Sequence, residues 1–316
     1  MIAFACTHEQ VKRFGHDRNG NQRFRCVLCG KTWIERQPKP LGDMRIEKSK
    51  AVLCLKLLLE DNSIRTIERV VGVNRNTILR LLETIGNRAL RYWEDKMTNL
   101  PAENVECDEI WGFVGCKQKT NNLIHKGYEF GDAYCFTAIE RDTKLMVAWH
   151  LGKRTPWDTE CFANRLRYVT SGRFQVSTDG YGPYKEAIPN AFDDQVEFAQ
   201  LIKIYQQPAG GQARYSPPEI AEIHTKVVCG NPVADLICTS HVERQNLNIR
   251  MGVRRMTRLT NAFSKKWENH EAHLAIYFLF YNFCRVHQTL KTTPAVKAGL
   301  TDKVWSVERL LDELAR

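Results

Sequence analysis

Residues 105–116 read VECDEIWGFVGC and place three carboxylates inside an otherwise apolar run. The apolar side chains are typical of a strand that is buried on both faces. Glu106, Asp108 and Glu109 do not suit that environment, because an unpaired carboxylate in an apolar sheet is strongly destabilising. We therefore expect the acidic cluster to be protonated, to pair with a cation or to bind a metal ion.

The segments that follow predict a mixed α/β domain. Two further β-rich apolar runs, 132–141 and 144–152, are separated by a turn-like Asp-Thr pair. Residues 156–170 read as a helix, and residues 173–178 read as a short strand that stops at Asp179. Three strands, a helix and another strand indicate a sheet covered by helices.

Two of the acids lie where α/β proteins usually form their sites. Asp108 is within the first strand, and Asp179 directly follows the fourth. Adjacent strands would bring the two carboxylates within metal-bridging distance, and carboxylates that close repel each other unless a divalent cation neutralises them. The sequence therefore predicts a metal site at these strands.

A third acid, Glu243, is expected in the first turn of a helix that Ser240 would cap. Asn246 and Arg250 follow three and seven residues later on the same helical face. By itself Glu243 would be an ordinary partner of the helix dipole. Beside Asp108 and Asp179 we interpret it as the third metal ligand.

The amino-terminal residues contain a Cys-x-x-Cys pair, Cys26 and Cys29, followed by Gly-Lys. This spacing suits one side of a tetrahedral zinc site, and the remaining candidates are Cys6 and His8. A second Cys-x-x-Cys is missing because Ala3 stands where its first cysteine would be. The alternatives are a zinc ribbon using these four residues, a degenerate ribbon without metal, and a pair of core cysteines.

The next segment predicts three helices. Ser63 would cap a short helix that ends at Gly72, and Asn74 would cap a longer third helix. This is the helix-turn-helix pattern, whose second helix enters the major groove of DNA. The alternative is a trihelical packing unit. The residues that would contact base edges or phosphates are Arg75, Asn76, Thr77 and Arg80.

Charge is distributed unevenly along the chain. Residues 1–100 hold 19 Lys+Arg against 11 Asp+Glu, residues 101–240 hold 14 against 18, and residues 241–316 hold 13 against 7, which gives +8, −4 and +6 and a net charge of +10. Basic ends around an acidic middle are typical of a protein that binds a polyanion at both ends and a cation between. The alternative is that the basic faces only keep the protein soluble.

Composition favours a folded cytoplasmic protein. The apolar run 274–284 is shorter than the roughly 20 residues that cross a bilayer, so no membrane partner is expected. The chain does not open with a basic and apolar leader. Most of the 11 cysteines occur singly in apolar segments, as in proteins with reduced thiols.

Together the motifs DEIWGF (108–113), STDGYGPY (177–184), SHVERQN (240–246) and YNFCRVHQTL (281–290) closely resemble bacterial transposases of the insertion-sequence-one family. The resemblance covers essentially the whole chain. It implies a DDE transposase with a ribonuclease H-like catalytic fold and a metal-binding triad of Asp108, Asp179 and Glu243. It also implies that Arg250 contacts the transposon end.

Several further expectations accompany the resemblance. Hard carboxylates favour two Mg²⁺ ions, with Mn²⁺ as an alternative. Double-stranded DNA, as transposon end and target, is the expected partner. Joining two ends implies a homodimer or a larger assembly. The expected location is the bacterial cytoplasm, at the nucleoid. Phosphate contacts are also expected from a polar and basic set after Glu243: Asn246, Arg250, Arg254, Arg255, Arg258, Lys265 and Lys266.

The organisation that follows is multidomain. Residues 1–36 would form the zinc-ribbon-like module, 44–95 the all-α helix-turn-helix domain, 103–295 the catalytic domain and 296–316 a helical tail. Residues 201–239 are expected to be an insertion made of loops with one short strand near residues 225–230, and Glu219 or Glu222 within it would be alternative third acids. The amphipathic tail would either mediate self-association or pack on its own chain.

Two other functions are consistent with the same residues. One is a DNA-binding regulator that has kept the fold and lost catalysis, and the other is a ribonuclease H-like nuclease without strand transfer. The intact acidic triad argues against the regulator. The separate helix-turn-helix, which suits recognition of a terminal repeat, argues against the nuclease.

Overall fold

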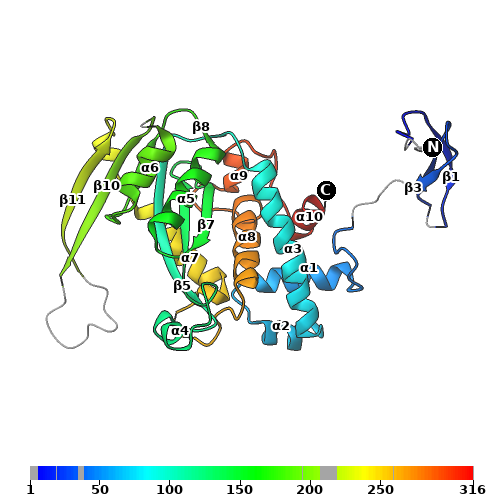
Figure 1. Cartoon of the computed structure of the whole chain (residues 1–316), viewed down its shortest axis with the longest axis horizontal. Coiled ribbons are helices and arrows are strands. Elements are labelled where there is room, and N and C mark those ends of the chain that lie inside the picture. Colours follow the sequence, from blue (N-terminus) through cyan, green and yellow to red (C-terminus); the bar gives the residue numbers. More distant parts are fainter. Residues whose placement is uncertain are drawn as a thin grey trace.

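The computed structural model describes residues 6–18, 20–34, 39–193, 195–206, 219–258 and 260–315. These residues form a small three-stranded ribbon, a helical region and a mixed α/β domain (Figure 1). Within the described ranges no helix combines the length and hydropathy that a membrane span requires.

The α/β domain is built on a six-stranded sheet in the order β11-β10-β9-β5-β6-β7. On one side of β5 the strands β6 and β7 continue as an antiparallel meander. On its other side β9 and β10 run parallel to β5, and β11 pairs antiparallel with β10 at the edge. The strands are β5 (Asn104–Val114), β6 (Gly131–Glu140), β7 (Met146–Gly152), β9 (Gln175–Thr178), β10 (Glu197–Gln206) and β11 (Glu219–Cys229).

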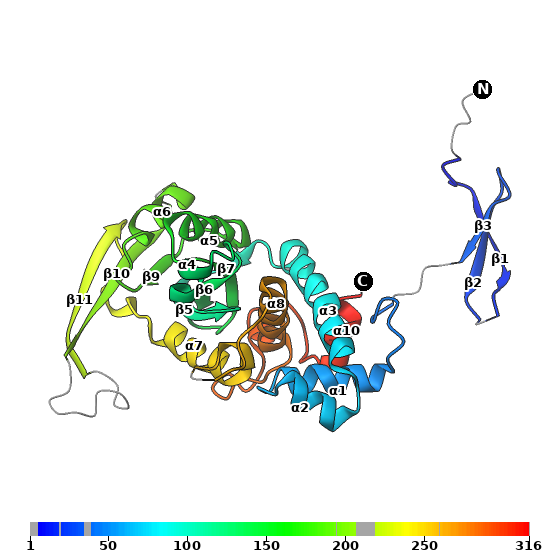
Figure 2. The ribbon, with the colours of Figure 1, turned by 60° about the horizontal axis from the view of Figure 1, so that its bottom comes forward.

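Helices cover both faces of this sheet. Figure 2 shows α5 and α6 on one face and α7 and α8 on the other. Among these helices α8 is the most deeply buried, and its aromatic residues pack between the sheet and the helical region. The helices and short strands of this domain are β4 (Leu100–Pro101), α4 (Gln118–Ile124), α5 (Pro156–Val169), β8 (Thr170–Ser171), α6 (Tyr184–Phe192), η1 (Ala234–Leu236), α7 (Ser240–Gly252), η2 (Arg254–Met256), α8 (Trp267–Phe283) and α9 (Pro294–Lys297).

The structure corrects the prediction for residues 201–239. Instead of loops with one short strand, most of the described part of this segment belongs to the long antiparallel pair β10 and β11. The predicted short strand near residues 225–230 overlaps the end of β11, but β10 and the rest of β11 were not predicted, because their outer parts are exposed and lack the apolar alternation of a half-buried strand. Residues 207–218, which precede β11, lie outside the described residues.

The helical region agrees with the capping signals in the sequence. The helices are α1 (Lys48–Leu58), α2 (Ile64–Val71) and α3 (Arg75–Lys96). The Ser63 side chain accepts a hydrogen bond from the Thr66 amide at 3.1 Å, and Gly72 ends α2 in the left-handed conformation with φ of 69°. The Asn74 side chain accepts from the Asn76 amide at 2.9 Å.

One close contact joins this region to the α/β domain. A Cβ atom placed on Gly86 of α3 would lie 2.2 Å from Cβ of Ala272 on α8, so the two helices approach where neither carries a large side chain. The buried apolar residues of α1, α2 and α3 are continuous with those of the sheet domain. The helical region therefore shares its core with the α/β domain.

The tail packs on its own chain. Helix α10 (Val307–Glu313) buries Leu310 and Leu311, and its Asp312 accepts a hydrogen bond from Lys48 of α1 at 2.7 Å. Of the two roles considered for the tail, packing on the parent chain is the one observed.

Candidate active site

The acidic run in β5 is distributed between the two faces of the sheet. Side chains alternate along a strand, so Glu106 and Asp108 point toward α7, whereas Glu109 points toward α6 and α5. The contacts agree: Asp108 accepts a hydrogen bond from Asn246 of α7 at 2.7 Å, and Glu109 pairs with Arg154 at 3.3 Å. Each acid therefore has its own partner.

The parallel pairing of β5 and β9 brings Asp108 and Asp179 together. Cys107 lies opposite Thr178 in the register, so the next residues on the two strands are neighbours. Carboxylate oxygens of Asp108, Asp179 and Glu109 all lie within 4.8 Å of one another. This is a donor set of hard oxygens, which suits a divalent cation such as Mg²⁺.

The electrostatics of this cluster are those of crowded anions. Burial, and then the charge of Asp179, raises the pKa of Asp108 to about 7. Burial, followed by the charges of Asp179 and Asp108, raises the pKa of Glu109 to about 8. Burial also raises the pKa of Asp179. A cation bound between them would relieve this repulsion.

Glu243 lies on the wall of the same cavity, which has a volume of about 570 Å³ and is also lined by Asp108 and Asp179. Its carboxylate accepts a hydrogen bond from the Thr239 hydroxyl at 2.7 Å and forms an ion pair with Lys203 of β10. The cavity therefore contains the three acids predicted from the sequence. Glu222, the alternative third acid on β11, is exposed and pairs with His224 at 2.8 Å; the side chain of Glu219 lies outside the described set.

Two cations at this cavity were not predicted. Arg154, which follows β7, approaches Glu109 at 3.3 Å and Asp179 at 4.0 Å and stacks over the Tyr181 ring. Lys203 pairs with Glu243. The sequence signals for both are weak, because Arg154 is in a loop and Lys203 is in the segment expected to form loops.

The third acid of the opening run orients helix α7. Glu106 is only 2% exposed, and its Oε2 accepts hydrogen bonds from the backbone amides of His241 and Val242 at 2.8 and 3.1 Å. Its Oε1 lies 2.6 Å from Nδ1 of His241. The sequence predicted Ser240 as the cap of this helix. Instead, Ser240 is the first helical residue, and a carboxylate from β5 satisfies the free amides.

The polar and basic residues after Glu243 that were expected to contact DNA differ in their exposure and hydrogen-bond partners. Arg250 lines the cavity, but its guanidinium donates to the carbonyls of Met256 and Trp111 at 2.9 and 3.1 Å. Arg254 pairs with Asp61 at 3.2 Å. The others divide by exposure: Asn246 and Arg255 bond to side chains inside the protein, whereas Arg258, Lys265 and Lys266 are exposed.

The helix-turn-helix candidates lie together at the amino-terminal end of α3. Arg75, Asn76 and Arg80 are exposed, and Thr77 is half-buried. The Arg75 amide donates to Glu68 at 2.9 Å, which fixes the turn between α2 and α3. The exposed side chains leave this end of α3 accessible, as a helix that contacts DNA requires.

The ribbon brings together the four candidate zinc ligands. Its strands are β1 (Val11–His16), β2 (Gln22–Cys26) and β3 (Thr32–Ile34). Ligand atoms of Cys6, His8, Cys26 and Cys29 all lie within 4.8 Å of one another. The pKa of the Cys26 thiol is lowered to about 6, chiefly by a hydrogen bond from the Cys29 amide. Three thiols and one imidazole are a donor set that zinc prefers.

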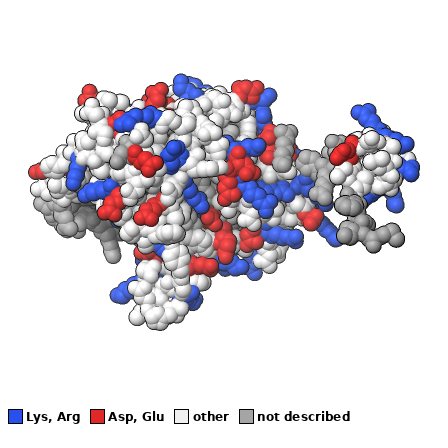
Figure 3. All heavy atoms as spheres, turned by 45° about the horizontal axis from the view of Figure 1, so that its top comes forward, with Lys and Arg blue, Asp and Glu red and all other residues white. Residues whose placement is uncertain are grey.

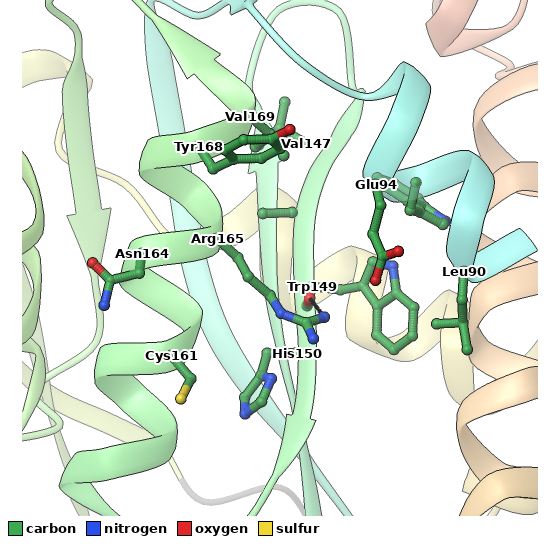
Figure 4. Close-up of a pocket in the computed structure, with 12 residues that line it drawn as sticks. Leu90, Glu94, Val147, Trp149, His150, Cys161, Asn164, Arg165, Tyr168 and Val169 are labelled. Carbon is green, nitrogen blue, oxygen red and sulfur yellow. Dashed lines mark hydrogen bonds between the residues drawn. The ribbon is translucent and has the colours of Figure 1, made fainter. Parts of the chain in front are cut away.

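A separate apolar cavity lies between α3, α5 and β7 (Figure 4). Trp149, His150 and Arg165 point into it, and Nη1 of Arg165 donates to the Trp149 carbonyl at 3.5 Å. It contains no cluster of carboxylates. The acidic cavity is therefore the better candidate for phosphate chemistry.

The exposed charges shown in Figure 3 are mixed in sign. Lys and Arg alternate with Asp and Glu over this face of the α/β domain. The candidate site is marked by the local concentration of acids at its cavity.

No known family profile matches the chain, and no curated protein matches it in sequence. Among solved structures the chain is similar to a piggyBac transposase determined by cryo-electron microscopy in a synaptic complex with hairpin DNA. The sequence identity is 10%, the similarity covers 89% of this chain and 72% of that chain, and the TM-score is 0.40. A similarity at this score does not by itself establish a shared fold or activity.

Proposed function

We propose that the protein is a DDE transposase, a metal-dependent enzyme that cleaves DNA at the ends of an insertion sequence and joins those ends to a target. The observation that carries the proposal is the convergence of Asp108, Asp179 and Glu243 on one open cavity from three separate elements. The mixed sheet, with an antiparallel meander on one side of β5 and parallel strands on the other, supports a ribonuclease H-like catalytic domain.

The carboxylates of Asp108, Asp179 and Glu243 would hold two Mg²⁺ ions. When bound, such ions supply an activated water and neutralise the charge of the reacting phosphate. The raised pKa values of Asp108 and Asp179 are consistent with this role, since a nearby cation would favour the charged form of each carboxyl group.

The other residues of the cavity would position these groups. The Asn246 amide holds one oxygen of Asp108, and the Glu109 backbone amide donates to the other at 2.8 Å. Thr239 orients Glu243. Arg258 is exposed at the same cavity and would contact a phosphate.

DNA would be bound by the end of α3 and by the exposed basic residues near Glu243. The four-ligand cluster of the ribbon supports a zinc-binding module, and the joining of two ends supports a homodimer or larger assembly. The tail, which was considered for self-association, packs on its own chain, and the aromatic helix α8 is buried. Among the described residues, the hairpin of β10 and β11 projects from the sheet and is the surface left for contact with a second copy of the chain (Figure 1).

The proposal is tested with DNA that carries the sequences flanking the gene. In the presence of Mg²⁺ the protein should nick this DNA at the end of the insertion sequence and form a strand-transfer product. Alanine variants of Asp108, Asp179 or Glu243 should form neither product, and their affinity for the DNA should change only a few-fold. Asp235→Ala, at an exposed acid of η1, is the matched control and should retain activity.

Three outcomes would contradict parts of the proposal. Normal nicking by Asp108→Ala would remove the catalytic assignment. Normal nicking by Glu243→Ala with loss in Glu222→Ala would move the third acid to β11. Binding without nicking would favour the inactive regulator, and nicking without a joined product would favour a nuclease.

A further inference from the structure

A second polar cavity lies on the other side of α7. Its volume is about 530 Å³, and α7, the β6–β7 turn and the segment after α8 all contribute to its lining. The residues that matter here are Lys144, Arg244, Gln245, Asn248, Arg285 and His287. Arg244, Gln245, Arg285 and His287 belong to the motifs SHVERQN and YNFCRVHQTL, and the acidic cavity gives these four residues no role.

Helix geometry explains why α7 serves two cavities. Glu243, Asn246, Leu247 and Arg250 line the acidic cavity, and His241, Arg244, Gln245 and Asn248 line the second one. Both sets have the spacing i, i+3, i+4, i+7, which is one helical face. They are offset by two residues, or about 200° around a helix of 3.6 residues per turn. The two faces are therefore nearly opposite.

Two buried side-chain nitrogens of the second cavity have no hydrogen-bond partner among the described residues. Gln245 is 1% exposed; its Oε1 accepts from Asn248 at 3.1 Å, but its Nε2 has no hydrogen-bond partner among the described residues. Nδ1 of His287 is also buried without a partner in the described chain. A buried amide donor without an acceptor is unfavourable, so a ligand with acceptor oxygens would be stabilising here.

The charges of this cavity are positive. No carboxylate is among its lining residues, and within the described ranges neither Arg244 nor Arg285 forms an ion pair. Lys144 donates one hydrogen bond to the Arg141 carbonyl, which leaves further donors on its ammonium group. The pKa of His287 is lowered by burial and then by the positive charges of Lys144 and Arg285. Glu106, Asp142 and Glu140 compensate the charge of Lys144 in part, whereas Arg244 and Arg285 have no paired carboxylate among the described residues, so the cavity has an excess of positive charge.

From these observations we infer that the face of α7 opposite Glu243 is a second binding site for backbone phosphates of DNA. The donors come from three separate segments, which suits successive phosphates along a strand better than one small anion. The inference rests on the proposed function for the identity of the polyanion. In this arrangement one helix contacts DNA through its basic face and carries a catalytic carboxylate on the other.

The test is the salt dependence of DNA binding by the full-length protein in EDTA. A fluorescent duplex of about 30 base pairs and arbitrary sequence is titrated at several KCl concentrations. The variant is Arg244→Gln combined with Arg285→Gln, both at exposed positions. Loss of two phosphate contacts should reduce the slope of log K against log salt by about 1.8, since each contact contributes about 0.9.

The matched control removes the same charge from the opposite side of the sheet. Arg167→Gln combined with Lys185→Gln alters exposed residues of α5 and α6 and should leave the slope unchanged. A further variant, Thr289→Glu, adds a negative charge at an exposed lining position and should weaken binding without removing any existing contact. Circular dichroism and the melting temperature check that every variant is folded.

The outcomes separate this site from the proposed function. Equal slopes in both double variants, or normal binding by Thr289→Glu, would overturn the inference. Binding of inorganic phosphate at this cavity, measured by calorimetry, together with an unchanged DNA slope would assign it to a free anion and also overturn it. Binding is measured in EDTA, so its result does not depend on whether the protein cleaves DNA. If the double variant has a reduced slope but the wild type does not cleave DNA in Mg²⁺, the second binding site stands and the transposase proposal fails.

Discussion

Replacing Asp108 with asparagine is expected to stabilise the metal-free protein at alkaline pH. The Asp108 carboxyl has an ordinary pKa of 3.8 and a pKa of about 7 in the folded protein, chiefly because it is buried. Its folded pKa is raised, so the folded state binds more protons than the unfolded state between these two values. The free energy of unfolding therefore decreases as pH rises from about 4 to 7.

The magnitude follows from the shift. About three pKa units correspond to roughly 4 kcal/mol of destabilisation above pH 7, and this is an upper limit. Asparagine has one acceptor oxygen, whereas the two Asp108 oxygens accept separately from Asn246 and from the Glu109 amide. Loss of one of these hydrogen bonds costs about 1 kcal/mol. We expect a net stabilisation of about 1–3 kcal/mol at pH 8.

The assay is thermal unfolding of the wild type and Asp108→Asn in EDTA at pH 8 and pH 4.5. The variant should melt at the higher temperature at pH 8, and most of the difference should disappear at pH 4.5. Added Mg²⁺ should stabilise the wild type more than the variant. Asp235→Asn, at an exposed acid, is the control and should show neither effect.

A variant that melts below the wild type at pH 8 would refute the reasoning. It would mean that the folded protein stabilises the ionised Asp108 carboxylate. An equal response of both proteins to Mg²⁺ would mean that the ion binds elsewhere.

Three other predictions concern the framework of the site. Gly86→Ala should lower the melting temperature and reduce the free energy of unfolding by about 1–3 kcal/mol, because the added Cβ would lie 2.2 Å from Cβ of Ala272. The control Gly182→Ala should leave the melting temperature unchanged, because a Cβ at that position would have no atom within 4 Å. Glu106→Gln should reduce unfolding free energy by about 1–3 kcal/mol, measured by denaturant titration, because an amide cannot accept all the hydrogen bonds at the start of α7; wild-type stability would contradict this. Arg80→Ala should reduce the salt slope of DNA binding by about 0.9, and an unchanged slope would exclude Arg80 as a phosphate contact.

Local signals in the sequence predicted much of the helical region. Ser63, Gly72 and Asn74 act within one or two turns of their own position, so their effects are readable without the fold. Strands β6, β7 and β9 were predicted for a similar reason, since a buried strand is apolar whatever it pairs with. Strand β10 and most of β11 were not predicted, because pairing between the two strands, and not a buried face, stabilises their outer parts.

The candidate site shows the same division. Asp108 and Asp179 were predicted because a carboxylate in or directly after an apolar strand conflicts with its surroundings. Glu109 was part of that conflict, yet its partner Arg154 could not be predicted, since the two are 45 residues apart and meet only through the sheet. The roles of Arg250 and Gln245 likewise depend on which neighbours the helix α7 finds.

The sequence alone therefore determined helices α2 and α3, strands β5, β6, β7 and β9, and which acids are out of place in those strands. The tertiary structure decided how those acids are used: Glu106 caps α7, Asp108 and Asp179 face each other, and Glu109 pairs with Arg154. The physical reason is range. Capping and burial act within a few residues along the chain, whereas the pKa of a carboxylate and its hydrogen-bond partners depend on groups brought within a few ångströms by folding.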